Sequence, residues 1–86
     1  MSNILSIKEE LAKRVRQRRR EGKISQAVLA EKSEVSLGSI KRFETSGDIS
    51  LSSLLRIAVV LGYEADFENL FARRNYQSLE DVINAK

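Results

Sequence analysis

The chain has 86 residues and a formal net charge of +3, and it contains neither cysteine nor histidine, which excludes disulfides, thiol nucleophiles, zinc-finger ligand sets and the commonest general base. No apolar run approaches the ~18–20 residues needed to cross a bilayer, and the N-terminus lacks the apolar core of a signal peptide. We therefore expect one small cytoplasmic domain with no catalytic centre, no metal or cofactor and no membrane contact.

The first predicted element is a helix over residues 6–21. Ser6 and Glu9 form a capping box, Gly22 marks the end, and apolar residues recur every four positions from Ile7 to Val15. Residues 1–23 carry eight Lys or Arg against three Glu, whereas residues 64–86 carry three against five Asp or Glu. This asymmetry favours a polyanionic partner at the basic end, and a solvated basic face is the open alternative. A membrane-surface helix is disfavoured because the apolar stripe is narrow and better used as core.

Two short helices follow, over residues 26–33 and 37–46. Each is preceded by an apolar residue and a serine, with a second apolar residue five positions after the first. The serine is placed to cap the helix by accepting from a first-turn amide, and the apolar pair is placed to pack together. Because the two starts are only eleven residues apart, the link is a tight turn. The pair predicts a helix-turn-helix unit, whose second helix enters the DNA major groove. The patterns are Ile24-Ser25…Leu29 and Val35-Ser36…Ile40.

A fourth helix over residues 51–61 begins with a third pattern of this kind, Ile49-Ser50…Leu54, and ends before Gly62. Since strand-like alternation is absent along the chain, the predicted class is all-α. We expect the inward face of the fourth helix to consist of Leu51, Leu54, Ala58 and Leu61, with Leu55 and Ile57 on its flanks.

A fifth helix covers roughly residues 65–72, so the predicted DNA-binding domain spans 1–72. Residues 73–86 form a short C-terminal extension, in which 78–84 are predicted to add a last helical turn or two. The end of the chain holds more apolar residues than a small core needs, which favours a dimer interface or a partner surface, with core packing as the alternative. These residues are Phe67, Leu70, Phe71, Tyr76, Leu79, Val82 and Ile83.

A fixed series of residues runs from Arg16 to about Leu70. It consists of Ser25-Gln26, Leu29-Ala30, Val35-Ser36, Ser39-Ile40 and Glu44, followed by Leu51, Leu54, Arg56-Ile57-Ala58 and Leu61-Gly62. In pattern and order this stretch resembles the lambda-repressor/Cro-type (XRE) helix-turn-helix family. The resemblance implies a compact five-helix domain that binds operator DNA as a homodimer and regulates transcription.

The resemblance also implies roles for single residues. Gln26 would lie over a phosphate and brace the base-reading side chains, and Ala30 would let the helices over 26–33 and 37–46 approach. Glu44 would pair with an arginine of the first helix, for which we expect Arg19. The turn position that usually holds glycine is Glu34 here, where a left-handed backbone costs a residue with a Cβ roughly 1 kcal/mol. Leu29, Val35 and Ile40 would belong to the core.

The predicted DNA contacts come from the helix over 37–46 and from the basic end. Arg42 can donate two hydrogen bonds to guanine O6 and N7, with a phosphate contact as the alternative. Leu37 can contact a thymine methyl and Gly38 can let the backbone approach, or the protein depends on DNA shape instead. The phosphate candidates of the basic end are Arg14, Arg16, Arg20 and Lys23. The complete predicted contact set is Arg20, Lys23, Ser25, Gln26, Ser36, Leu37, Gly38, Ser39, Lys41 and Arg42.

Two functions stay open on the sequence. The first is a sequence-specific, double-stranded DNA-binding transcriptional regulator, expected to be a dimeric repressor. The second is an antitoxin that binds its own operator and a protein toxin, because residues 64–86 are similar to the ends of regulators that accompany HipA-type kinase toxins. An enzyme is disfavoured, since no nucleophile–base pair or metal-ligand set is visible.

Overall fold

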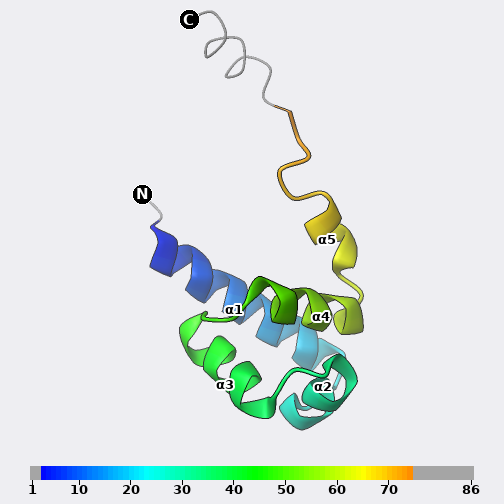
Figure 1. The fold of residues 1–86 in the computed structure, drawn as a ribbon. Helices are drawn as coiled ribbons and strands as arrows, with labels where there is room; N and C mark the ends of the chain where they lie inside the picture. Colours follow the sequence, from blue (N-terminus) through cyan, green and yellow to red (C-terminus); the bar gives the residue numbers. More distant parts are fainter. Residues whose placement is uncertain (1–2, 75–86) are drawn as a thin grey trace, which may run out of the picture.

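The computed structural model describes residues 3–74, which form five helices and no strand (Figure 1). Three of the helices occupy the predicted residues, and the all-α class is confirmed. The last turns predicted over residues 78–84 lie outside the described residues. The helices are α1 (Ile4–Glu21), α2 (Gln26–Ser33), α3 (Leu37–Ser46), α4 (Leu51–Leu61) and α5 (Glu64–Glu68).

α1 begins two residues before the predicted start at Ser6, so that prediction was wrong. Asn3 is the N-cap, because its Oδ1 accepts a hydrogen bond from the Ser6 amide at 2.8 Å. An asparagine caps a helix as well as a serine does, and Ser6 then lies inside the first turn, where it cannot cap. At the other end, Gly22 follows the last helical residue as predicted, and the left-handed residue is Lys23 (φ 57°).

Both predicted serine caps of the helix-turn-helix are present. Ser25 Oγ accepts from the Val28 amide and Ser36 Oγ accepts from the Ser39 amide, each at 3.1 Å. These bonds satisfy amides that the first turn of a helix leaves free, and they fix where α2 and α3 begin.

The turn between α2 and α3 is tight, as predicted, and Glu34 is left-handed (φ 61°), so the protein accepts a residue with a Cβ at this position. The buried Ser33 stabilises it from inside. Ser33 Oγ donates to the Leu29 carbonyl at 2.6 Å and accepts from the Val35 amide at 3.3 Å. The turn therefore keeps its buried polar groups bonded although glycine is absent.

The core consists of two clusters that share Val15 and Ile49 as partly buried neighbours. The first cluster contains the predicted core residues of the helix-turn-helix, and the second contains Ala12 and Phe43, which the sequence analysis did not single out. The buried members are Leu29, Val35, Ile40 and Ile57 in the first cluster and Ala12, Phe43 and Leu54 in the second.

The inward face of α4 is rotated from the predicted one. Ile57, predicted on the flank, is 1 % exposed, whereas Leu51, predicted to point inward, is 64 % exposed. At ~100° per residue, Leu54, Ile57, Ala58 and Leu61 lie within an arc of roughly 100°, and Leu51 lies just outside it.

α5 ends at Glu68, before the predicted end at residue 72. Phe67 packs against the second cluster, but Phe71 has a left-handed backbone (φ 62°) and is 96 % exposed. Because no apolar side chain of residues 68–74 reaches the core, packing does not extend the helix over these residues.

Candidate nucleic-acid interface

α3 is anchored in the core along one side and exposed along the other. Ile40 and Phe43 are 0 % and 1 % exposed and hold the helix in place. A side-chain row on a helix anchored in this way is positioned more rigidly than one on a loop. The exposed residues, which we call the α3 edge, are Ser36, Leu37, Gly38, Ser39, Lys41 and Arg42.

The α3 edge begins with small residues, Ser36, Gly38 and Ser39, that are exposed to solvent. Ser36 Oγ donates to Ser39 Oγ at 2.8 Å, in addition to its capping bond. A Cβ built on Gly38 would meet nothing within 4 Å, so this glycine is not required by packing within the chain. Its backbone is accessible to a ligand that approaches closely.

Arg42 projects from α3 beside a carboxylate. Its side chain is 73 % exposed, and Nη2 lies 3.9 Å from Asp48 Oδ2. Asp48 also forms an ion pair with Lys8 of α1, and the hydrogen bond from Lys8 lowers the pKa of Asp48 below its ordinary value. Arg42 therefore stands beside an ionised group and keeps most of its donors exposed. Ser39 and Arg42 line a hollow of about 480 Å³ together with Asp48, Ile49, Ser50 and Ser53.

A second hollow joins the end of α1 to the start of α2 and the end of α3, and we call it the basic hollow. Its volume is about 380 Å³. It brings together three predicted contact residues, Arg20, Ser25 and Gln26. Its lining is Arg16, Arg19, Arg20, Ser25, Gln26, Glu44 and Thr45. The predicted residues that line neither hollow are Lys23, Ser36, Leu37, Gly38 and Lys41, all of them exposed.

An ion pair between Arg19 and Glu44 forms the base of the basic hollow, as predicted. Arg19 Nε lies 2.7 Å from Glu44 Oε2 and Nη2 lies 3.0 Å from Oε1, with side chains only 9 % and 4 % exposed. Arg19 Nη1 also donates to the Ile24 carbonyl at 2.8 Å. Gln26 Nε2 donates to Glu44 Oε1 at 3.0 Å, so the carboxylate fixes the amide of Gln26 at the start of α2.

Glu44 is ionised at neutral pH. Burial raises the pKa of Glu44, but hydrogen bonds from Arg19 and Gln26 and the charges of Arg19 and Arg16 outweigh this effect and hold it below the ordinary value. Arg16 Nε lies 4.0 Å from Glu44 Oε1 and is half exposed, so it extends the positive charge from the buried pair to the surface.

The pairing of Lys8 with Asp48 was not predicted from the sequence, and Gly47 was the available signal for it. Its φ is 80°, and a Cβ there would lie 2.8 Å from Lys8 Cβ, so the glycine permits a close approach of α1 as well as ending α3. Arg14 was grouped with the phosphate candidates, but it lines an apolar groove with Leu11 and lies outside the basic hollow.

Charged and polar donors on rigid helices are the groups that bind phosphate oxygens and base edges. Within residues 3–74, no group of three or more His, Cys, Asp or Glu is arranged to hold a metal ion. In the same part of the chain, no helix has the length and apolar character required to cross a membrane.

A family model for helix-turn-helix proteins matches residues 15–67, which is more than half of the chain. No curated protein and no solved structure matches the chain significantly. The matched range contains every predicted contact residue and the buried pair of Arg19 and Glu44. The chain therefore belongs to the lambda-repressor/Cro-type (XRE) helix-turn-helix family of DNA-binding regulators.

Proposed function

We propose that the protein is a sequence-specific regulator that binds double-stranded DNA as a homodimer and represses transcription by occupying a promoter. The observation that carries the proposal is the α3 edge, an exposed row of small and basic residues on a helix anchored by Ile40 and Phe43. A helix of this kind suits insertion into the major groove, which admits an α-helix.

Direct base readout is assigned to Arg42 and Leu37. The exposed guanidinium of Arg42 can donate to guanine O6 and N7, a contact that discriminates against other bases by ~1–3 kcal/mol. Leu37 offers an apolar surface to a thymine methyl. Gly38 lies one helical turn before Arg42, and its lack of a side chain leaves room for the DNA between Leu37 and Arg42. Lys41 is assigned to the phosphates at the wall of the groove.

Phosphate binding is assigned to the basic hollow. Arg16 and Arg20 supply charge there, and Ser25 and Gln26 stand at the start of α2, where free amides favour an anion. Glu44 holds the Gln26 amide in one orientation, which reduces the entropy lost on binding. Contacts of this class fix the position of the protein on DNA without reading its sequence.

A homodimer would place two copies of α3 in successive major grooves, about 34 Å apart. The operator is then expected to be a pair of inverted half-sites. The antitoxin alternative depends on residues 64–86, and those after Arg74 lie outside the described residues. Co-purification of a kinase-like protein would support that alternative.

Selection of binding sites from a random duplex pool, followed by footprinting, tests the proposed function. With the selected site in hand, Arg42→Ala should lose discrimination at one or two base positions in each half-site. Arg20→Ala should weaken binding to all sequences by a similar factor. Lys32→Ala, which removes an exposed lysine that lines neither hollow, is the matched control and should change neither property. Failure to select any common sequence, or equal effects of the Arg42 and Arg20 substitutions on every sequence, would contradict the proposal.

A further inference from the structure

An apolar groove of about 230 Å³ lies between α1 and the corner of α4 and α5. It contains Arg14 and Arg18, whereas the basic hollow contains Arg16 and Arg20. Two residues separate these pairs, which is about 200° around a helix at ~100° per residue. The groove and the basic hollow are therefore on opposite sides of α1, and a partner in the groove leaves the hollow open.

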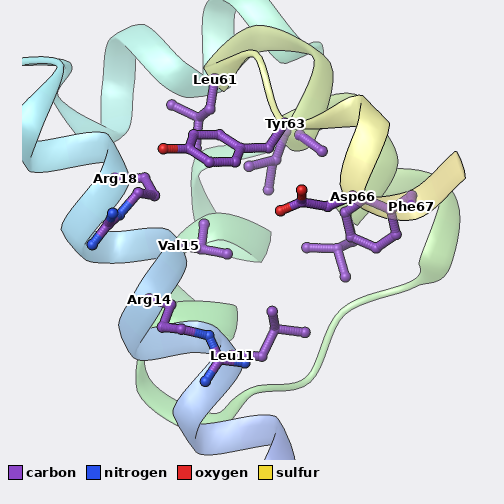
Figure 2. Close-up of a pocket in the computed structure, with 11 residues that line it drawn as sticks. Leu11, Arg14, Val15, Arg18, Leu61, Tyr63, Asp66 and Phe67 are labelled. Atoms are coloured by element: carbon purple, nitrogen blue, oxygen red, sulfur yellow. The ribbon is translucent and has the colours of Figure 1, made fainter. Parts of the chain in front are cut away.

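The groove has an apolar floor and a charged rim. Figure 2 shows Arg14 and Arg18 on α1 along one side of the groove, and Asp66 and Phe67 of α5 on the opposite side, with Tyr63 at one end. Three of the floor residues, one at each end of the groove and one between, remain partly exposed to solvent. The floor consists of Leu11, Val15, Leu54, Ile57, Ala58 and Leu61, of which Leu11, Val15 and Leu61 are the partly exposed ones.

Arg18, at this rim, has one hydrogen-bond donor that lacks an acceptor within the described residues. Its Nε is buried and makes no hydrogen bond within the described residues, and the carboxylate oxygen paired with it, Glu21 Oε1, is 3.4 Å away on an exposed side chain. A buried donor without an acceptor is unfavourable, so a carboxylate brought by a partner would be stabilised here.

The sequence that follows the described residues has the complementary pattern. Leu79, Val82 and Ile83 have the spacing of one helical face, and Glu80 and Asp81 lie between them. On a helix Glu80 lies at the edge of this face and Asp81 on the opposite side. An apolar face with a carboxylate at its edge matches an apolar floor whose rim carries Arg14 and Arg18 together with Asp66.

The direction of the chain decides which molecule receives this segment. Residues 69–74 run from α5 away from α1 and α4 (Figure 1). Only residues 75–78 precede Leu79, and four residues span at most ~14 Å. A chain that leaves in this direction is better placed to reach another molecule than to reverse into its own groove.

We propose that residues 78–84 of one copy bind in the groove of a second copy, reciprocally, so that each chain completes the groove of the other. Leu79, Val82 and Ile83 cover the floor, and Glu80, at the edge of that apolar face, pairs with a rim arginine. The arrangement is a symmetric dimer with two identical contacts. It assigns the dimer interface, goes beyond the proposed function, and can be tested without DNA, so its failure leaves the DNA-binding proposal intact.

A charge exchange between groove and segment tests the proposal in the full chain. Arg14→Glu/Arg18→Glu gives an acidic rim with an acidic segment, and Glu80→Arg/Asp81→Arg gives a basic rim with a basic segment. Each variant alone should dissociate at about tenfold or more higher concentration than the wild type in sedimentation velocity, because like charges meet. In an equimolar mixture both grooves meet a segment of opposite charge, so a heterodimer should form with near wild-type affinity.

Helicity by circular dichroism shows that each variant is folded, and Glu31→Arg/Glu68→Arg, at exposed acids outside the groove, should leave the dimer unchanged. Val82→Asp, which alters no groove residue, should give a helical monomer. A mixture of folded variants that stays monomeric overturns the proposal, as does a Val82→Asp dimer. A wild-type chain that is monomeric at every concentration also overturns it, because the segment then occupies its own groove or none.

Discussion

Replacing Glu44 by glutamine removes one charge from a buried pair while keeping the size of the side chain. It leaves the guanidinium of Arg19, which is 9 % exposed, without its carboxylate and deprives Gln26 of an ionised acceptor. Removing one partner of a buried ion pair costs ~3–5 kcal/mol. A domain of this length has a free energy of unfolding of only ~4–13 kcal/mol. At ~4–8 °C per kcal/mol, the midpoint of thermal unfolding should fall by at least ~12 °C.

The measurement is thermal unfolding followed by circular dichroism at pH 7. Glu31→Gln, at an exposed glutamate of α2, is the matched control and should shift the midpoint by less than ~3 °C. The double variant Arg19→Met/Glu44→Leu removes both charges and should recover part of the loss, because no unpaired charge remains buried. A Glu44→Gln midpoint within ~3 °C of the wild type would refute the reasoning.

The same pair predicts acid sensitivity. Because the pKa of Glu44 is lowered in the folded state, the unfolded chain binds this proton more readily. Its contribution to stability is complete above the ordinary value of 4.5 and is lost as the pH falls through the lowered folded value. The wild-type midpoint should therefore decrease below pH 4.5 more steeply than that of Glu44→Gln, which has no proton to bind there.

Three further changes test the packing and the turns. Ile40→Ala opens a cavity at a fully buried site of α3 and should cost ~2–5 kcal/mol in calorimetry, so an unchanged midpoint would contradict the packing of α3. Leu51→Ala, at an exposed site of α4, should cost under ~0.5 kcal/mol, and a loss as large as that of Ile40→Ala would contradict the observed face of α4. Glu34→Gly removes a Cβ from a left-handed backbone and should raise the free energy of unfolding, measured by urea titration, by ~0.3–1 kcal/mol. A loss of stability would mean that the carboxylate of Glu34 makes a stabilising contact. Gly47→Ala should cost ~1–3 kcal/mol of stability, because the added Cβ would lie 2.8 Å from Lys8 of α1. Gly62→Ala, at a left-handed residue in open space, should cost less, and a larger loss for Gly62→Ala than for Gly47→Ala would show that α1 does not approach Gly47 closely.

The helix-turn-helix could be predicted because its signals are local. Ser25 and Ser36 each act on an amide three residues away, and the spacing between them determines the turn. The family resemblance marked Glu34 as the turn position, and the structure shows that its backbone is left-handed. The start of α1 could not be chosen in this way, because Asn3 and Ser6 are both good caps.

The candidate site was predictable only in part, because some of its contacts join residues far apart in the chain. Arg19 and Glu44 could be paired through the family resemblance, and the structure gives the geometry. The pairing of Lys8 with Asp48 has no local pattern, since it depends on how α1 crosses the end of α3. The position of Arg14 beside the apolar groove could not be predicted, because eight basic residues within 23 positions do not reveal which side of a helix each one occupies.

The division of positive charge around α1 limits how strongly ionic strength can affect DNA binding. When the logarithm of the DNA-binding constant is plotted against the logarithm of the salt concentration, each phosphate neutralised on duplex DNA adds about 0.9 to the downward slope. Eight cations acting together would therefore give a slope near 7 for each chain. Four of the eight in residues 1–23 are engaged elsewhere, since Lys8 and Arg19 are paired with carboxylates and Arg14 and Arg18 line the groove. The four that remain are Lys13, Arg20, Lys23 and Arg16, which stays half exposed at 4.0 Å from Glu44, and they limit the slope from this region to about 4. Operator affinity at physiological salt then depends more on contacts that release no counterions, and those are the uncharged contacts of the α3 edge.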